Sequence, residues 1–84
     1  MVENSQGKII LYGTSWCGST RRARTLLDEE KIEYVWVDIE KDDEAAKYVE
    51  SVANGFRSVP TLRFPDGTVL VEPSMFELRS KLGL

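Results

Sequence analysis

The 84-residue sequence contains no histidine and only one cysteine, Cys17. Without histidine, the chain cannot form a Cys–His or Ser–His catalytic pair. A lone cysteine cannot close an internal disulfide. The chain also lacks the several cysteine and histidine ligands that a mononuclear zinc site usually needs, so we expect no metal site. Any chemistry must therefore rest on one sulfur, on carboxylates, on hydroxyl groups or on the backbone.

The chain also lacks an excess of basic charge and any long apolar run. Its net charge of -3 and isoelectric point near 4.9 argue against a nucleic-acid partner. No apolar run approaches the roughly 18 residues that a membrane span needs. The polar segment 1–7 has neither the basic nor the apolar region of a signal peptide. We therefore predict a cytoplasmic protein without a membrane partner, in which residues 1–7 are disordered.

What the chain does contain is an alternation of strand and helix patterns, which predicts one domain over residues 1–84. Apolar and β-branched runs predict strands at 8–12 and 33–39. Helical spacing predicts a helix from about residue 20 and a second one around 45–53, which Asp42 or Asp43 could cap.

The last third of the chain has a different pattern. Pro65-Asp66-Gly67 separates two short alternating runs, which predicts a β-hairpin over 61–71. A final helix is expected after Pro73. We expect Phe76, Leu78 and Leu82 to form its apolar face, and Glu77 to pair with Lys81 one turn later.

The order of these elements is strand–helix–strand–helix–strand–strand–helix. The first two strands are joined through a helix and must be parallel, with a right-handed crossover. The hairpin adds antiparallel pairing. We therefore predict an α/β protein with the thioredoxin-like fold, a four-stranded mixed sheet flanked by helices.

The segment 14–20 follows the first strand and leads into the first helix. Cys17 in this position faces the unpaired N–H groups and the positive dipole end of the helix, which favour an anion. The thiolate is both an anion and the nucleophile, so we expect a lowered pKa for Cys17. Gly18 allows a tight turn, the amides of Ser19 and Thr20 are aimed at the sulfur, and the Thr20 hydroxyl can donate another hydrogen bond. The alternative is that Cys17 is a small buried apolar side chain.

A second unusual position is Pro60, at the start of the third predicted strand. Proline cannot donate to a strand ladder, so it is normally found there only at edges or special sites. We predict a cis Val59–Pro60 bond that places the Val59 backbone beside Cys17 and offers an unpaired edge to a peptide-like substrate. An ordinary trans proline is the alternative.

Together these segments resemble the glutaredoxins, and within them the mycoredoxins, glutaredoxin-like proteins of actinobacteria that use mycothiol. The matching segments are 14–18, 37–40, 54–61, 64–67 and 73–74. The resemblance implies thiol–disulfide exchange on proteins that carry a small thiol, with Cys17 as nucleophile. It further implies that the substrate is bound by Trp16, Arg57, Val59, Pro60 and Ser74. In the family, the residue at the Arg57 position lies near the ligand carboxylate, and that at Ser74 near the γ-glutamyl end of glutathione.

The sequence departs from the glutaredoxin pattern at three places. Thr20 stands where a second cysteine would resolve the mixed disulfide, which leaves a monothiol cycle. Thr14 stands where a basic residue often precedes the motif. Val71-Glu72 replaces the Gly-Gly pair before the last helix, so the identity of the small thiol, mycothiol or glutathione, stays open.

Three functions are compatible with these residues. The first is a monomeric monothiol oxidoreductase that takes oxidised or thiolated proteins as substrates and a small thiol as co-substrate, with no bound cofactor. The second is an iron–sulfur carrier, which would need two chains and two external thiols to supply four thiolates. The third is a thioredoxin-fold binding protein without catalytic activity.

Overall fold

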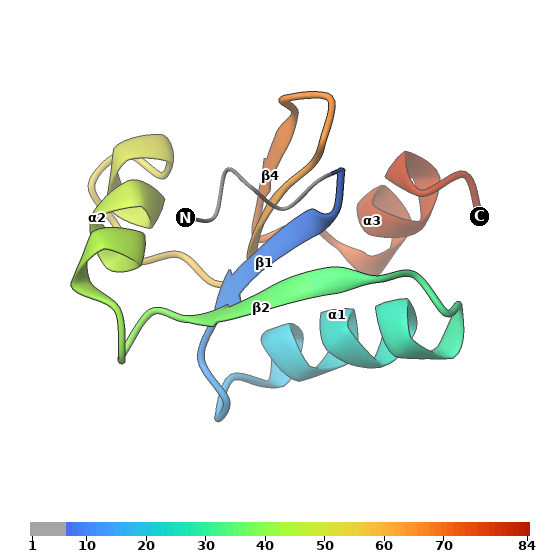
Figure 1. Cartoon of the computed structure of the whole chain (residues 1–84), viewed down its shortest axis with the longest axis horizontal. Helices are drawn as coiled ribbons and strands as arrows, with labels where there is room; N and C mark the ends of the chain where they lie inside the picture. Colours follow the sequence, from blue (N-terminus) through green and yellow to red (C-terminus); the bar gives the residue numbers. More distant parts are fainter. Residues whose placement is uncertain (1–6) are drawn as a thin grey trace.

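The computed structural model describes residues 7–84, so the expected disorder of residues 1–7 lies outside the described part for all but Gly7. The predicted order of elements and the thioredoxin-like fold are confirmed (Figure 1). The strands are β1 (Ile9–Gly13), β2 (Tyr34–Asp38), β3 (Thr61–Arg63) and β4 (Val69–Val71), and the helices are α1 (Gly18–Glu29), α2 (Asp43–Val52) and α3 (Met75–Lys81).

The four strands form one mixed sheet in the order β2-β1-β3-β4. Strand β1 is parallel to β2 and antiparallel to β3, and β3 and β4 form the predicted hairpin. All five residues of β1 are buried, because this strand has a neighbour on each side and helices over both faces. The segment that follows β1 therefore leaves the sheet from its most deeply buried strand.

Alternate residues of β1 point to opposite faces of the sheet and build two separate cores. Ile9 and Leu11 pack with apolar side chains of α1 and α3, whereas Ile10 and Tyr12 pack with those of α2. Figure 1 shows the same division, with α2 on one side of the sheet and α1 and α3 on the other. The periodicity of α1 correctly predicts that Ala23, Leu26 and Leu27 are buried.

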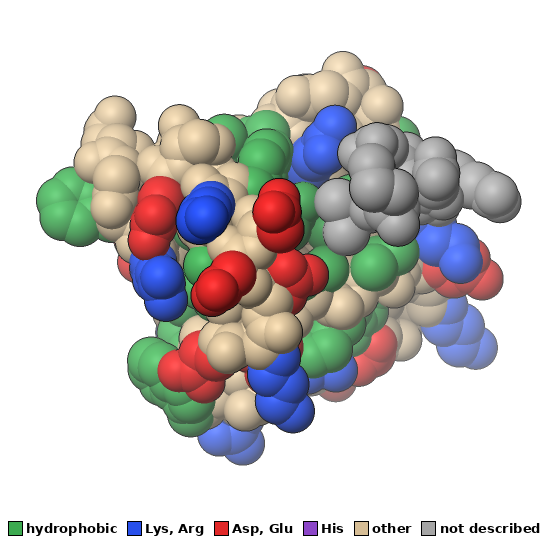
Figure 2. Space-filling model, turned by 60° about the vertical axis from the view of Figure 1, so that its left-hand side comes forward, with side chains coloured by type: hydrophobic (Ala, Val, Ile, Leu, Met, Phe, Trp, Pro, Cys, Tyr) green, Lys and Arg blue, Asp and Glu red, His purple; other side chains and the backbone are tan. Residues whose placement is uncertain are grey.

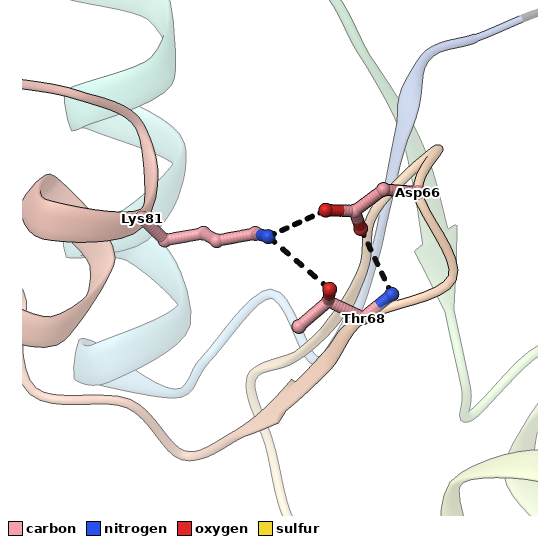
Figure 3. Close-up of polar contacts among 3 residues, drawn as sticks. All are labelled: Asp66, Thr68 and Lys81. Atoms are coloured by element: carbon pink, nitrogen blue, oxygen red, sulfur yellow. Dashed lines mark hydrogen bonds and ion pairs between the residues drawn. The ribbon is translucent and has the colours of Figure 1, made fainter.

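The hairpin is tied to α3 by Lys81 rather than by the expected pair within the helix. Lys81 Nζ lies 2.7 Å from Asp66 Oδ2 and 3.2 Å from Thr68 Oγ1 (Figure 3). The ammonium group, together with the N–H and hydroxyl of Thr68, holds the pKa of the Asp66 carboxyl well below its usual range. The expected pair of Glu77 with Lys81 is wrong, because the Glu77 carboxylate instead accepts from the Ser74 N–H at 2.8 Å.

The expected apolar face of α3 is correct for only part of the helix. Leu78 is 1% exposed and Leu82 is partly buried against the same core, but Phe76 is 79% exposed. Two residues along a helix correspond to a turn of about 200°, so Phe76 lies opposite Leu78. Met75, three residues before Leu78, occupies the inward position instead.

The surface combines charges of both signs. Figure 2 turns the α2 side toward the viewer and shows acidic and basic side chains interspersed, with no broad basic patch in this view. Within residues 7–84, no helix combines the length and apolar character that crossing a bilayer requires.

Candidate active site at the start of the first helix

The loop 14–17 emerges at the carboxyl ends of the two parallel strands β1 and β2, the edge at which open α/β sheets bind ligands. Trp16 lies in this loop and is 67% exposed. Its Nε1–H donates to Glu40 Oε2 at 3.1 Å, which joins the loop after β1 to the residues after β2. The indole ring is therefore held beside the cysteine with most of its surface open.

Helix α1 begins at Gly18, about two residues before the predicted start, and Cys17 is its N-cap residue. The Cys17 carbonyl accepts from the Arg21 N–H at 3.0 Å, but within the described residues its side chain makes no capping hydrogen bond. The partly exposed thiol instead points to the Val59 carbonyl, with Sγ and O separated by 3.9 Å. This exposure argues against the alternative of a buried structural cysteine.

Opposing effects act on the acidity of Cys17. Burial by itself raises the pKa of the thiol, but the backbone N–H and hydroxyl of Thr20 and the backbone N–H of Ser19, which favour the thiolate as hydrogen-bond donors, outweigh it. The carboxylate of Glu72 acts in the opposite sense to these donors. The net result is a pKa below the ordinary value, so the predicted direction is confirmed.

Thr20 is fully buried, and with the thiol turned to Val59 its hydroxyl has no hydrogen-bond partner among residues 7–84. A buried hydroxyl without a partner is costly, so this group is available to a thiolate at Cys17. The threonine fits here because residue 13 is glycine. A Cβ atom on Gly13 would lie 2.5 Å from Thr20 Cγ2 and 2.8 Å from its Oγ1.

Gly13 is thus a positioning residue that the sequence pattern did not single out, since the predicted strand ends at residue 12. It lies within β1, and its carbonyl accepts from the Ile39 N–H at 3.0 Å. A glycine at the last position of a buried strand is a known sign of close approach by another segment. The sequence does not indicate which segment approaches, because Thr20 reaches Gly13 only through the fold of the loop between them.

The corner before β3 has the predicted form, since the Val59–Pro60 peptide bond is cis. Among the described residues, the Val59 N–H has no hydrogen-bond partner, whereas its carbonyl faces the thiol. Pro60 is buried, and its carbonyl accepts from the Glu72 N–H at 2.8 Å. One side of this corner is therefore open, and the other is fixed to the segment between β4 and α3.

A hollow of about 350 Å³ brings together three of the predicted site residues, Ser19, Pro60 and Ser74. Ser74 is the N-cap of α3, and its hydroxyl accepts from the Glu77 N–H at 3.0 Å. The Glu77 side chain returns a hydrogen bond to the Ser74 N–H, which completes a capping box. The Ser74 N–H and one acceptor position of its hydroxyl are therefore already used within the helix start.

Arg57 and Trp16 do not line this hollow. Arg57 is exposed, and its Nε lies 2.8 Å from Glu50 Oε2 near the end of α2. The predicted site residues therefore divide into a group around Cys17 and the hollow, and two flanking side chains, each already paired with a carboxylate.

Glu72 is a site residue that sequence reasoning noted only as a departure from a glycine pair. Its φ of 48° lies in the left-handed region, which favours glycine. It lines the hollow next to Ser74, and its charge acts on Cys17. The replacement of a glycine by a glutamate was itself the signal, but only the structure shows that its charge acts on the thiol.

Comparison with known proteins agrees with this geometry. The glutaredoxin family model matches residues 9–70. A protein of Mycobacterium tuberculosis that carries the name glutaredoxin is 46% identical over 74 residues, which cover 88% of each chain. Mycoredoxin 1 of Corynebacterium glutamicum is 38% identical over 74 residues, 88% of this chain and 91% of that one.

Solved structures show the same fold. A glutaredoxin from Methanosarcina mazei superimposes with a TM-score of 0.75 at 26% identity, over 94% of this chain and 81% of that chain. A glutaredoxin from Archaeoglobus fulgidus superimposes with a TM-score of 0.73 at 23% identity, over 95% of this chain and 90% of that chain.

Proposed function

The chain belongs to the glutaredoxin family, and from this premise we propose that it is a monothiol thiol–disulfide oxidoreductase that acts through Cys17. Its substrates are proteins that carry a small thiol in a mixed disulfide. The small thiol, mycothiol or glutathione, is also the co-substrate. The enzyme works as a cytoplasmic monomer, without a bound cofactor.

The reaction takes place in two exchanges. In the first, the Cys17 thiolate attacks the small-thiol sulfur of the mixed disulfide; a Cys17–small thiol disulfide forms and the protein thiolate leaves. In the second, a further small-thiol thiolate attacks the sulfur of the bound small thiol. A symmetric small-thiol disulfide leaves, and Cys17 is again a thiolate. Over the whole cycle, the mixed disulfide of the protein and one small-thiol thiolate become the protein thiolate and a symmetric small-thiol disulfide, so one disulfide replaces another and the cycle is balanced.

The observation that carries this proposal is the thiol at the start of α1, partly exposed and with a lowered pKa. Attack on a disulfide depends on the thiolate fraction and on access to the sulfur. Thr20 supports the ionised form but cannot act as a resolving thiol. The cis-proline corner supports it further, because the open Val59 N–H lies on the residue whose carbonyl faces the thiol.

Mass spectrometry of the protein after incubation with oxidised mycothiol or oxidised glutathione tests the proposal. We expect one small-thiol adduct on Cys17 that persists until a second thiol is added. In Thr20→Cys, the new thiol should instead displace the small thiol and form an internal disulfide with Cys17, because position 20 lies one turn into the helix that Cys17 caps.

If neither oxidised thiol forms an adduct, the exchange cycle is wrong and a binding protein without catalysis becomes the better interpretation. An iron–sulfur carrier would be recognised by visible absorbance of the freshly purified protein, because a cluster is coloured and a bare thiol is not.

A further inference from the structure

Glu72 has a charged side chain on a backbone conformation that favours glycine. Its φ is 48°, and its N–H is bonded to the Pro60 carbonyl at 2.8 Å. This bond fixes the residue against the corner that faces Cys17. The exposed carboxylate lies at the rim of the hollow formed with Ser19, Pro60 and Ser74.

Two donors at the start of α3, the N–H groups of Ser74 and Glu77, are bonded within the capping box. The box also adds a second acidic residue, Glu77, to the lining of the hollow. On the other flank, Arg57 is paired with Glu50. An acid group of a small thiol bound in the hollow would meet two acidic residues of its lining, Glu72 and Glu77.

Among the described residues, one cation lines the hollow, Arg22, whose Nη2 donates to Ser19 Oγ at 3.1 Å. Arg22 also lines a second hollow, of about 550 Å³, between α1 and Met75 of α3. It therefore offsets the two carboxylates only in part.

We infer that Glu72 is a specificity-determining residue that disfavours small thiols bearing a carboxylate and favours neutral or cationic ones, in the hollow between Cys17 and Ser74. The inference rests on the proposed function, because it concerns which disulfide Cys17 attacks. The occupant it predicts is a small thiol with hydroxyl or other uncharged polar groups at the end that lies along α3.

The size of the effect follows from Coulomb's law for two partly solvated charges. At short range, repulsion between the Glu72 carboxylate and a carboxylate of the disulfide should change the rate constant for attack by Cys17 about three- to tenfold at low salt. The same carboxylate also weakens the acidity of Cys17, which would change the rates with every disulfide alike. A ratio of rates with differently charged disulfides cancels that common factor.

The experiment measures second-order rate constants for the reaction of Cys17 with three symmetric disulfides of different charge. Oxidised glutathione is the anionic probe, hydroxyethyl disulfide the neutral one and cystamine the cationic one. Glu72→Gln removes the charge and keeps a side chain at the left-handed position. Glu44→Gln, an exposed position in α2, is the control for a change in net charge.

Relative to hydroxyethyl disulfide, we expect Glu72→Gln to raise the rate with oxidised glutathione about three- to tenfold at low salt and to lower the rate with cystamine. Both changes should shrink in about 0.5 M salt, where the Debye length is about 4 Å. Glu44→Gln should leave both ratios within about twofold of the wild type, because its charge is on the other side of the sheet.

Ratios that are the same in Glu72→Gln and wild type would overturn the inference, and so would equal changes in Glu72→Gln and Glu44→Gln. Neither outcome would affect the proposed function. A Cys17 that reacts with none of the three disulfides would instead contradict the proposed function itself.

Discussion

The first turns of α1 and α3 differ in how their unpaired N–H groups are capped. Both helices begin with N–H groups that have no partner inside the helix. At α3, Ser74 and Glu77 satisfy these groups with a complete capping box, and at α2 the Asp42 side chain accepts from the Ala45 N–H at 3.1 Å. At α1 the N-cap residue is Cys17, whose side chain makes no such bond within the described residues.

The difference shows that α1 lacks a stabilising oxygen cap at the residue that carries the reactive thiol. An oxygen cap would contribute roughly 1 kcal/mol at the start of α1. The thiol gives up most of that stabilisation, but when it ionises, the same N–H groups and the Thr20 hydroxyl stabilise the thiolate. Because the thiol form leaves the N–H groups at the start of α1 without a side-chain acceptor, these groups are available to the thiolate.

Replacing the sulfur by oxygen breaks the comparison most completely. Cys17→Ser should lose all formation of a small-thiol adduct, because a serine hydroxyl does not ionise near neutral pH. It should also stabilise the protein by about 0.5–1 kcal/mol, since serine is a good N-cap. Mass spectrometry after incubation with a disulfide measures the first effect and urea unfolding the second; an adduct that persists would place the chemistry elsewhere than Cys17.

The next largest effect is expected from the strand that supports α1. Gly13→Ala places a methyl group within 2.5 Å of Thr20 Cγ2, so Thr20 or the strand must move. We expect a loss of about 1–3 kcal/mol in the free energy of unfolding, typical of an overpacked core. Gly18→Ala is the matched control, because its new methyl group meets only Arg22 Nη1 at 3.6 Å. Equal losses in the two variants would contradict a close approach at Gly13.

Removing the oxygen cap of α3 tests the other side of the comparison. Ser74→Ala leaves the Glu77 N–H without its acceptor and should cost about 1 kcal/mol of stability in urea unfolding. Ser80→Ala, at an exposed position in the last turn of the same helix, is the control and should stay within about 0.5 kcal/mol of wild type. If both variants are equally stable, the capping box does not stabilise α3.

The smallest change, Thr20→Val, sharpens the comparison by removing one donor while keeping the shape. It should raise the pKa of Cys17, seen as a higher midpoint in the pH dependence of iodoacetamide alkylation. At a pH where Cys17 is a thiol, the protein should become more stable by up to about 1 kcal/mol, because a buried hydroxyl without a partner is removed.

The pH dependence of stability provides an independent check on Thr20→Val. A folded pKa below the unfolded one gives stability that is fully present above the unfolded pKa and is lost as the pH falls through the folded pKa. Relative to Cys17→Ser, wild type should therefore gain stability as the pH rises through the lowered folded pKa of Cys17 toward the ordinary pKa of a cysteine, and Thr20→Val should gain less. A midpoint and a pH profile unchanged in Thr20→Val would show that its hydroxyl does not reach the thiolate.

Local patterns predicted the fold because each element carries its own signal. The buried run before Gly13, the stripe of α2 and the Asp66-Gly67 turn specify their elements without distant partners. The predictions were wrong where the partner of a side chain depended on contacts between helices and strands. Lys81 had two acidic partners within reach, and only the packing of α3 against the hairpin decides for Asp66.

The site was predictable to a similar extent. Cys17 and its helix donors follow from a strand–loop–helix order, and the Val59–Pro60 corner from a proline at an unusual place. Gly13 and Glu72 could not be assigned, because their importance lies in what approaches them from far along the chain.

The contact between positions 13 and 20 also limits how this sequence can diverge. A Cβ atom at position 13 would lie 3.2 Å from the Cβ of residue 20, a distance that depends on no particular side chain there. The closest contact, at 2.5 Å, is with Cγ2 of Thr20, an atom that serine and cysteine lack. Replacing Thr20 by either residue would therefore relax the restriction to glycine at position 13, although the contact between the two Cβ atoms would remain tight. A single substitution that turns monothiol into dithiol chemistry would thus also change what the preceding strand can accept.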